Sequence, residues 1–583
     1  MSGNDSILEL VKSSYFNKPI YKEAYCGVPE NYKDITTLGE LLENNYKYRS
    51  TKLQLRENLI SKLRNNENPF IGIIGFDQTV IPAVKRAILA GHDILFIGHI
   101  GQGKTKLAEI LSENLLSPIP IVDGTITNDI PTEMPYSHLI NLLQDKNILR
   151  SVPEFFVSKD CEEIIKNNKL DTKIKWVDGK SRYRYVLATP DITVKDLVGQ
   201  IDVVKVIKKG IEVFDIDSYS PGYLLQARYG ILCLDELPVL DPRKQVTMLS
   251  ILQEGRFTTG ALPVFFKPDV KIIATANPID YTHSGKIIEP LADRLKSHIE
   301  THYPKTLDDE ILILIQEIDM LSRSNTFLPI FILKIIAKIF QSLRNNPEIN
   351  SERGVSVRST IHSMEIVLGE VEVSRSIINN IFTVPRYSDI YCILQSSKFE
   401  LDEIDDTSEN KSKILNNTII EIIKEISRDY FTKIITAEDL LMIRNEFKGK
   451  TFTVLQNPYP VSNITETLET SKVIKSNLKN LNSKNCKMLY SEQLKQFPHL
   501  KKIIKTSMDT IMEEQNEYIK KAHKNNISKN LEYLDSIKQT SLDESTKQEE
   551  IISTIMELLL EYLRFSIPPV LDRKENKFEY TEI

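Results

Sequence analysis

The chain has 583 residues, a length that predicts several domains with buried cores. Its hydrophobic content of 41%, charged content of 26% and net charge of -6 give no electrostatic case for binding nucleic acid or a membrane surface. No C-x-x-C pair, secretory signal or run of 18 apolar residues occurs, so we expect no zinc site, no disulfide framework, no membrane span and a cytoplasmic location.

The N-terminal half of the chain changes pattern once. Residues 1–68 predict an N-terminal helical extension, with one amphipathic helix from Leu38 to Leu63. From residue 69 to 304, short apolar segments alternate with helical ones, which predicts an α/β domain built on a parallel sheet. The candidate strands are Ile94–Gly98, Ile119–Asp123, Gly230–Asp235, Val270–Ala276 and His298–His302.

Helical patterns dominate the rest of the chain. Residues 305–397 predict a helical domain, with helices at Asp308–Leu321 and Pro329–Leu343. A polar, acidic stretch from Lys398 to Ser412 predicts a linker, and residues 398–583 as a whole predict an all-α C-terminal region of unknown role. The helices expected there are Lys413–Tyr430, Ala437–Phe447, Leu494–Lys524 and Thr546–Arg564.

A phosphate-loop pattern, G-x-x-x-x-G-K-[ST], occurs as Gly98, Gly103, Lys104 and Thr105. An apolar run precedes it and a helix-forming run follows, which is the context that the motif needs. Backbone N–H groups of such a loop surround phosphates, the lysine reaches the outer phosphates, and the hydroxyl of Thr105 can serve Mg²⁺. We therefore predict a nucleoside triphosphate site formed by Gly98, His99, Ile100, Gly101, Gln102, Gly103, Lys104, Thr105 and Lys106.

The segment GILCLDEL, Gly230 to Leu237, predicts a buried strand that delivers two carboxylates to its C-terminal edge. Asp235 would order Mg²⁺ through the water shell of the ion, and Glu236 would act as general base on the attacking water. An apolar run followed by Asp-Glu also occurs without function in many proteins. Its position after a phosphate loop favours the functional interpretation.

Two further polar residues follow in the chain. Asn277 ends the strand KIIATANP and could place an amide beside the water and the terminal phosphate, although Asn-Pro also simply starts a turn. Arg294, in EPLADRLKSHIE, could reach a neighbouring subunit's terminal phosphate, and its alternative is a solvated arginine at a helix end.

The order phosphate loop, Asp-Glu strand, Asn strand, Leu-Ala-Asp-Arg and helical region resembles the AAA+ ATPase superfamily over residues 68 to about 397. Its details are closer to the magnesium-chelatase I subunit and to MoxR-type ATPases. Residues 196–237 are similar to that family's insert in helix 2, and residues 252–278 resemble its hairpin before the sensor strand. GVSVRSTIHSMEI fits the small-x-x-Arg signature, so Arg358 is the candidate second sensor, with a plain surface charge as its alternative.

The resemblance implies an AAA+ P-loop core with a helical lid, and Mg²⁺-dependent hydrolysis of ATP held between the subunits of a ring, commonly a hexamer. It implies that Asn277 senses the terminal phosphate, that Arg294 is the finger from the neighbour, and that Arg358 contacts nucleotide, in cis or in trans. The implied partners are copies of the same chain and a client or companion protein, with a metal-dependent adhesion domain as one option for that companion.

Two departures from the family pattern stand out. Leu295 replaces the aromatic residue that usually follows the arginine. A surplus segment from Met134 to Tyr185, which includes the only tryptophan, Trp176, is either a partner-specific surface or a decorated loop.

Four functions compete. The first is an ATP-driven machine that remodels a partner protein, and the second is the motor of a true magnesium chelatase. No Cys/His cluster that would hold a porphyrin and no D-x-S-x-S pattern is visible. The third, a transcription activator, is suggested by LSILQEGRF, but the GAFTGA loop of such activators is absent. The fourth, a non-hydrolysing scaffold, conflicts with the presence of Glu236, Asn277 and Arg294.

Overall fold

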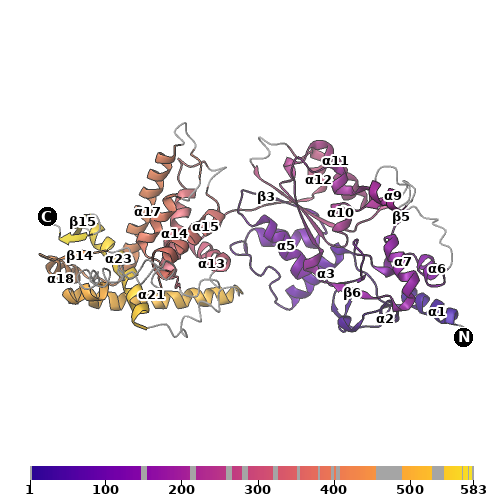
Figure 1. Ribbon diagram of the computed structural model, residues 1–583, viewed down its shortest axis with the longest axis horizontal. Coiled ribbons are helices and arrows are strands. Elements are labelled where there is room, and N and C mark those ends of the chain that lie inside the picture. The colour runs from indigo at the N-terminus through magenta and orange to yellow at the C-terminus, as the bar shows by residue number, and fades with distance from the viewer. Residues whose placement is uncertain are drawn as a thin grey trace, which may run out of the picture. The chain divides into compact units, whose positions relative to one another are not determined.

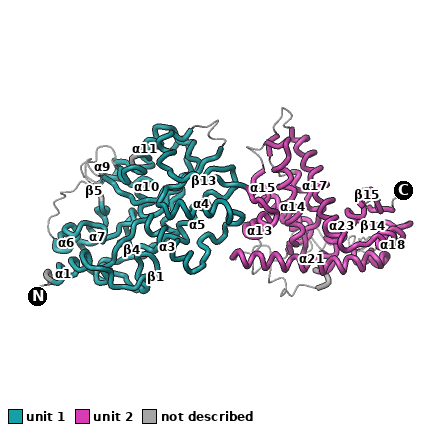
Figure 2. Tube along the Cα trace, turned by 180° about the vertical axis from the view of Figure 1, so that it is seen from behind, with its two compact units in different colours: residues 1–302 teal, residues 303–583 magenta. Residues whose placement is uncertain are grey.

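The computed structural model divides by its internal contacts into two compact units, residues 1–302 and 303–583 (Figure 2). This boundary lies two residues before the predicted end of the α/β domain, whereas the finer division at residues 68 and 397 stays a prediction. The structure describes residues 3–145, 154–209, 218–257, 265–278, 286–319, 326–350, 355–377, 381–395, 399–401, 407–454, 489–527, 544–566, 569–574 and 577–580.

A five-stranded parallel sheet forms the centre of unit 1 (Figure 1). Its strands lie in the order β13 (Ser297–Glu300), β3 (Ile94–Ile97), β12 (Lys271–Ala276), β10 (Ile231–Asp235) and β7 (Tyr183–Leu187). All six residues of β12 are buried, as expected for a strand covered on both faces. The predicted α/β architecture is thereby confirmed.

The two faces of this sheet carry separate apolar cores. Along β10, Ile231 and Cys233 belong to one core, and Leu232 and Leu234 to the other, because successive side chains of a strand point to opposite faces. The first core is covered by α3 (Thr51–Arg64), α4 (Val80–Leu89) and α5 (Lys104–Leu115). The second is covered by α10 (Tyr223–Gln226), α11 (Pro242–Glu254) and α12 (Glu289–Arg294) (Figure 1).

One predicted strand joins a different sheet. Ile119–Asp123 is a strand, β4 (Ile119–Val122), but it pairs antiparallel with β6 (Ile174–Val177) in a sheet of two. The edge position beside β10 belongs to β7 instead. An apolar run marks burial but not the pairing partner, and β4 is buried against the N-terminal extension, where Ile119 and Ile121 share a core with Tyr46.

The predicted single helix Leu38–Leu63 is wrong. The structure has two helices there, α2 (Leu38–Glu43) and α3, separated by residues 44–50. Asn45 has φ +51°, a left-handed conformation that ends a helix and that asparagine tolerates better than most residues. The start of α2 could be predicted from the sequence, because Thr37 and Glu40 form a capping box.

The surplus segment is part of the fold of unit 1. It contains α6 (Tyr136–Leu143), β5 (Glu154–Phe155), α7 (Lys159–Asn168) and β6, and it supplies the first residues of β7; its residues 146–153 lie outside the described part. Helices α6 and α7 share a core with α1 (Gly3–Phe16) and α2. Trp176 donates from Nε1 to the carbonyl oxygen of Ile35 at 2.9 Å.

Residues 196–237 and 252–278, which resemble insertions of the family, each contain an antiparallel pairing. β8 (Gln200–Ile201) pairs with β9 (Tyr219–Ser220), and between them lies α9 (Val203–Lys209). Phe257 pairs with Phe266, at the end of β11 (Phe265–Phe266), which itself pairs with β5. The tips of both segments, residues 210–217 and 258–264, lie outside the described part.

The remaining short strands of unit 1 are β1 (Glu23–Tyr25) and β2 (Val28–Pro29), and the remaining short helix is α8 (Val194–Val198).

Unit 2 is mainly helical, as predicted. Its helices are α13 (Leu307–Glu317), α14 (Ile330–Arg344), α15 (Val357–Val371), α17 (Ser408–Phe431), α18 (Ala437–Phe447), α20 (Tyr490–Gln493), α21 (Pro498–Lys524) and α23 (Glu544–Phe565). A small antiparallel sheet, which was not predicted, adds β14 (Thr451–Thr453), β16 (Lys577–Tyr580) and β15 (Leu571–Lys574). Helix α17 already begins at Ser408, inside the predicted linker, and residues 398 and 402–406 of that linker lie outside the described part.

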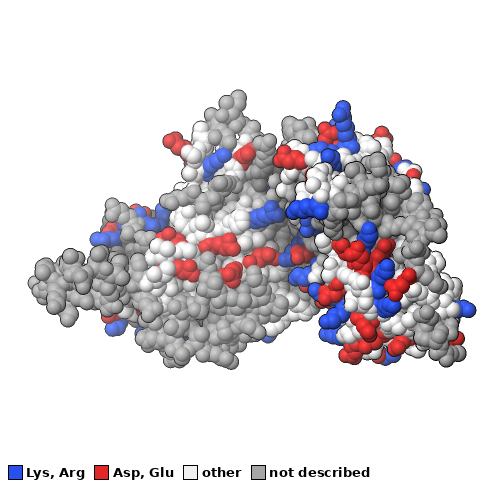
Figure 3. Space-filling view, turned by 45° about the vertical axis from the view of Figure 1, so that its right-hand side comes forward, with Lys and Arg blue, Asp and Glu red and all other residues white. Residues whose placement is uncertain are grey.

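Acidic and basic side chains are interspersed on the face shown in Figure 3. Within the described residues, no helix is both long and apolar enough to cross a membrane.

Candidate functional site

The phosphate loop connects β3 to α5, as the sequence predicted. Gly101 and Gly103 have φ of +80° and +71°, left-handed values that cost little only for glycine. Gly103 is the N-cap residue of α5 and offers no side-chain cap to the first N–H groups of that helix. These N–H groups and the helix dipole make the loop a site for an anion.

Gly98 leaves no room for a side chain. A Cβ atom there would lie 2.1 Å from Oγ1 of Thr301 and 2.2 Å from Oε1 of Gln102. Its N–H donates to the carbonyl oxygen of Ala276 at 3.1 Å, so the start of the loop is fixed against β12. Gln102 is 6% exposed and accepts a hydrogen bond from Thr301 at 2.7 Å. Its side chain therefore supports the shape of the loop, and its backbone remains the part that can face phosphate.

Lys104 lies over its own loop. Its ammonium group donates to the carbonyl oxygens of Gly98 and of His99, the latter at 2.8 Å. These are weak acceptors for a full charge compared with phosphate oxygens, so an anion in the loop would be a stronger partner. Thr105 follows it in the first turn of α5 and is half-buried, with Lys106 next to it, while Ile100 is 51% exposed.

Polar residues follow three neighbouring strands at the same edge of the sheet. Ala276 pairs with Ile97, so Asn277 and Gly98 lie side by side just beyond the ends of β12 and β3. Leu234 pairs with Ala274, which brings Asp235 and Glu236 next to Thr275. The sequence predicted this gathering, since carboxyl ends of parallel strands meet at one edge.

Thr275 and Tyr185 hold Asp235, and the sequence reasoning missed both. The Thr275 hydroxyl donates to Oδ1 of Asp235, and the Tyr185 hydroxyl donates to Oδ2 at 2.8 Å. Burial and the neighbouring Asp235 raise the pKa of Tyr185 to about 12, so its hydroxyl keeps its proton at neutral pH. Glu236 has φ +57°, and its N–H donates to Oγ1 of Thr275 at 3.0 Å.

The two predicted arginines belong to other elements than these three strands. Arg294 is the last residue of α12 and is half-buried. Among the described residues, it makes no hydrogen bond or ion pair. Arg358 belongs to unit 2, where it is exposed in the first turn of α15, after the N-cap residue Ser356. The strand pairings therefore gather the loop, the two carboxylates and Asn277, whereas Arg294 belongs to α12 and Arg358 to unit 2.

The gathered residues fit a magnesium nucleotide. The loop offers backbone donors and one lysine to phosphates, and Thr105 and Asp235 offer oxygen atoms, the ligand type that Mg²⁺ takes. Within the described part of the chain, no group of three or more His, Cys, Asp and Glu side chains is placed to hold a metal. A magnesium ion shared with phosphate oxygens needs only one or two protein ligands, so the donor set is sufficient.

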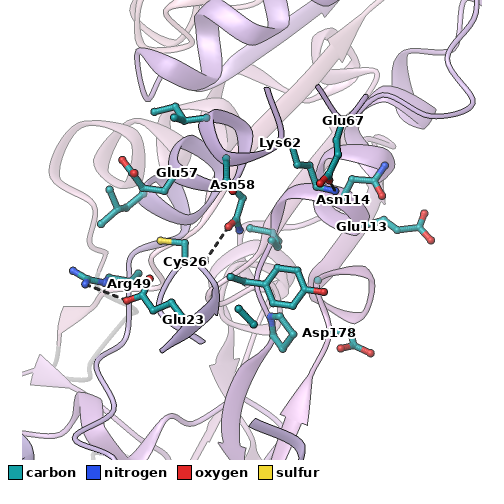
Figure 4. A pocket seen from close by; sticks show the side chains of 18 of the residues that line it. Glu23, Cys26, Arg49, Glu57, Asn58, Lys62, Glu67, Glu113, Asn114 and Asp178 are labelled. Atoms are coloured by element: carbon teal, nitrogen blue, oxygen red, sulfur yellow. Dashed lines mark hydrogen bonds and ion pairs between the residues drawn. The ribbon is translucent and has the colours of Figure 1, made fainter. Parts of the chain in front are cut away.

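A polar groove of about 990 Å³ lies elsewhere in unit 1 (Figure 4). It is lined by Glu113 and Asn114, near the C-terminal end of α5, whereas the phosphate loop is at the N-terminal end of that helix. Several of its charged side chains pair with one another, as in Glu23–Arg49 at 3.7 Å and Lys62–Glu67 at 3.5 Å. The groove is therefore separate from the nucleotide site.

Part of unit 1 matches a known protein family. Residues 169–295, which include β10, β12 and α12, match the family model of an AAA domain of the dynein-related subfamily. This part of the chain is therefore similar to an AAA domain, and the parallel sheet with flanking helices agrees with the AAA+ fold class that the sequence predicted.

The sequence is also similar to I subunits of magnesium chelatase. It is 23% identical over 330 residues to subunit ChlI from Cyanophora paradoxa, covering 54% of this chain and 84% of that protein. It is 25% identical to the chloroplastic ChlI of Glycine max, covering 40% of this chain but only 48% of that protein. Among solved structures, a complex of subunits BchI and BchD of magnesium chelatase matches with a TM-score of 0.29 at 16% identity, covering 59% of this chain and 98% of that one.

Proposed function

We propose that this protein is a Mg²⁺-dependent ATPase of the cytoplasm that works as a ring and uses ATP hydrolysis to remodel a partner protein. The observation that carries the proposal is the meeting of the phosphate loop, the Asp235–Glu236 pair and Asn277 at one edge of three adjacent strands. These are the groups that phosphoryl transfer to water requires: an anion cradle, carboxylates for metal and base, and a polar group beside the terminal phosphate.

Each group has a defined task in this proposal. The loop and Lys104 bind and orient the phosphates, while Thr105 and Asp235 hold Mg²⁺, which neutralises phosphate charge when bound. Glu236 accepts the proton of the attacking water, and its fixed backbone bond to Thr275 keeps it beside Asp235. Asn277, which is 7% exposed, follows β12 beside the start of the loop, and its amide would contact the terminal phosphate.

The ring and the partner are supported by weaker observations. Arg294, without an ion pair among the described residues, is suited to complete the site of a second copy, and six copies is the number that the family resemblance favours. Arg358 would contact nucleotide from unit 2. The partner would be a client or companion protein, for which a metal-dependent adhesion domain is one option.

A second candidate function is the motor subunit of a true magnesium chelatase. It is favoured by the similarity to ChlI proteins, although the chain spans only about half of the length of some of them. Purification of the protein from its native cell with its partners distinguishes the two: a large porphyrin-binding subunit supports the chelatase, and another protein supports remodelling.

ATP hydrolysis is the first property to test. Lys104→Ala should abolish ATP binding, because it removes the charged group of the loop. Glu236→Gln should bind ATP normally and lose turnover, because an amide cannot accept the proton of water. Release of inorganic phosphate and binding of a fluorescent ATP analogue measure the two effects, with the exposed Glu30→Gln as a control that should change neither. Wild-type turnover in Glu236→Gln would contradict the assigned base.

A further inference from the structure

Both oxygen atoms of Asp235 are held by hydroxyl groups from the two strands beside β10. Thr275 comes from β12 on one side, and Tyr185 comes from β7 on the other. We propose that Tyr185 and Thr275 are positioning residues that fix the Asp235 carboxylate for a magnesium-bound nucleotide. This inference rests on the proposed function and gives the hydroxyl groups of these two residues a role toward Asp235 that the proposal above does not assign.

The position of Tyr185 follows from the register of the sheet. Cys233 pairs with Tyr185 and Asp235 pairs with Leu187, so the Tyr185 side chain starts two residues before the carboxylate. The phenol ring is long enough to cover this offset, and its hydroxyl reaches Oδ2 at 2.8 Å. Tyr185 is 46% exposed, so its ring is only partly buried and packing alone does not explain its position at this edge.

Thr275 links the two acidic residues. Its hydroxyl donates to Asp235 and accepts the N–H of Glu236 at 3.0 Å, so one oxygen atom sets the orientation of a carboxylate and of the next peptide unit. That peptide unit belongs to Glu236, whose left-handed backbone at φ +57° is costly for a residue with a side chain. The hydrogen bond from the Glu236 N–H to Thr275 therefore stabilises this left-handed backbone conformation.

The two hydroxyls leave Asp235 able to act on a metal. Each carboxylate oxygen has two lone pairs and can accept a second hydrogen bond, for example from water on a magnesium ion. A carboxylate held at both oxygens loses little conformational freedom when such a partner arrives, so its interaction with the metal is strengthened.

The test measures nucleotide binding rather than turnover. All variants are made on Glu236→Gln protein, and the affinity for an N-methylanthraniloyl-labelled ATP is measured in EDTA and across a magnesium titration. Tyr185→Phe and Thr275→Val remove one hydroxyl each with little change of shape, and Thr275→Ser restores the hydroxyl. Tyr223→Phe is the matched control, since Tyr223 lies on α10, outside the sheet edge.

The expected result is specific to magnesium. Tyr185→Phe and Thr275→Val should keep the affinity measured in EDTA and should each raise the half-saturating magnesium concentration by about tenfold, the value of one hydrogen bond to a charged group. Thr275→Ser and Tyr223→Phe should titrate like the parent. In protein with an intact Glu236, the same substitutions should lower kcat and shift its magnesium dependence without changing the affinity in EDTA.

Other outcomes separate this inference from the proposed function. Parent-like magnesium titrations of both Tyr185→Phe and Thr275→Val overturn the positioning role, even if the protein hydrolyses ATP. Equal losses in EDTA and in magnesium, or a lower unfolding temperature by Trp176 fluorescence without a magnesium effect, also overturn it in favour of a structural role. If the parent binds ATP more tightly with magnesium but never hydrolyses it, the proposed function fails while the titrations still decide the role of Tyr185.

Discussion

Buried charged side chains in unit 1 are compensated in different ways. Arg228 donates to Asp129 at 3.1 Å, and both side chains are almost fully buried. Arg182, which is 2% exposed, donates instead to the backbone carbonyl oxygens of Ser117 and Tyr229. For Glu133, burial raises the pKa to about 7, although Arg228 acts in the opposite direction. Near neutral pH, the folded state therefore holds Glu133 partly protonated.

Glu133 should make the stability of unit 1 depend on pH. Its folded-state pKa of about 7 is above the ordinary value of 4.5, so the folded state holds the proton more tightly than the unfolded chain does. The stabilisation is complete below pH 4.5 and is lost as pH rises through 7. Glu133→Gln, which never ionises, should therefore stabilise unit 1 relative to the parent by up to about 3 kcal/mol at pH 8 and by little at pH 4.

Trp176 provides the measurement. It is the only tryptophan of the chain and packs edge-on against Tyr32 and Tyr46 in unit 1, so its fluorescence in a urea titration reports the unfolding of that unit. Glu30→Gln, at an exposed pair with Lys22, is the control and should show no such pH dependence. A free-energy difference between Glu133→Gln and the parent that is the same at pH 4 and pH 8 would contradict the prediction.

At the scale of elements, the sequence predicts buried strands that end in polar residues and helices that begin with a capping residue. β10 and β12 are continuous apolar runs that end in polar residues, and α18 starts after Thr436, which forms a capping box with Asp439. β7 has the sequence YRYVL and mostly outward-facing or half-buried side chains, so it carries no apolar run. Tyr185 lies on this strand, and its contact with Asp235 depends on a pairing between distant segments. The loop, Asp235 and Glu236 could therefore be predicted, but the hydroxyls that hold them could not.

A buried ionic network connects elements of unit 2 that are far apart in the sequence. Arg375, in the π-helical segment η8 (Glu372–Ser376), pairs with Asp389 in the 3-10 segment η9 (Tyr387–Gln395) at 2.7 Å. Arg386 pairs with Glu550 of α23 at 2.6 Å, and Glu550 also lies 3.4 Å from Arg375. All four side chains are almost fully buried. Helix α23 thus packs against the predicted lid, although no local signal in the sequence indicates this contact.

Removing one charge from this network should strongly destabilise unit 2. Glu550→Gln leaves Arg375 and Arg386 with too little compensating charge in a buried place, and we expect a loss of about 3–5 kcal/mol in the free energy of unfolding. Glu579→Gln removes the partner of Lys574 at the surface and should cost less than about 1 kcal/mol. Denaturation followed by circular dichroism measures both, and the transition that Trp176 fluorescence does not report belongs to unit 2. A cost for Glu550→Gln no greater than that for Glu579→Gln would mean that the network contributes no net stability.

At the scale of the whole molecule, the question is whether one chain completes its own site. Each unit has its own core, and the loop, the carboxylates and Asn277 all belong to unit 1. Phosphoryl transfer builds negative charge on the terminal phosphate, and an arginine supplied in trans commonly stabilises it. Arg294 closes α12, directly before Leu295, whose side chain is 1% exposed and anchors this end of the helix in the core. The backbone at Arg294 is therefore fixed, while its side chain is half-buried and makes no ion pair among the described residues.

Arg294→Ala should bind ATP nearly as the parent does and hydrolyse it about 10³- to 10⁵-fold more slowly, the range that a finger in trans contributes in other phosphoryl-transfer systems. Mixing it with Lys104→Ala should restore part of the activity, because one variant supplies intact loops and the other intact arginines. Light scattering in the presence of ATP, on Glu236→Gln protein, establishes whether rings form, and Arg243→Ala, an exposed position on α11, is the control for loss of an arginine. If Arg294→Ala alone turns over ATP normally, Arg294 is a solvated charge, and Arg358 becomes the next candidate for the arginine that acts in trans. If mixed rings form but no activity returns, sites are not shared between copies. A shared site would combine the intact loop of one variant with the intact arginine of the other.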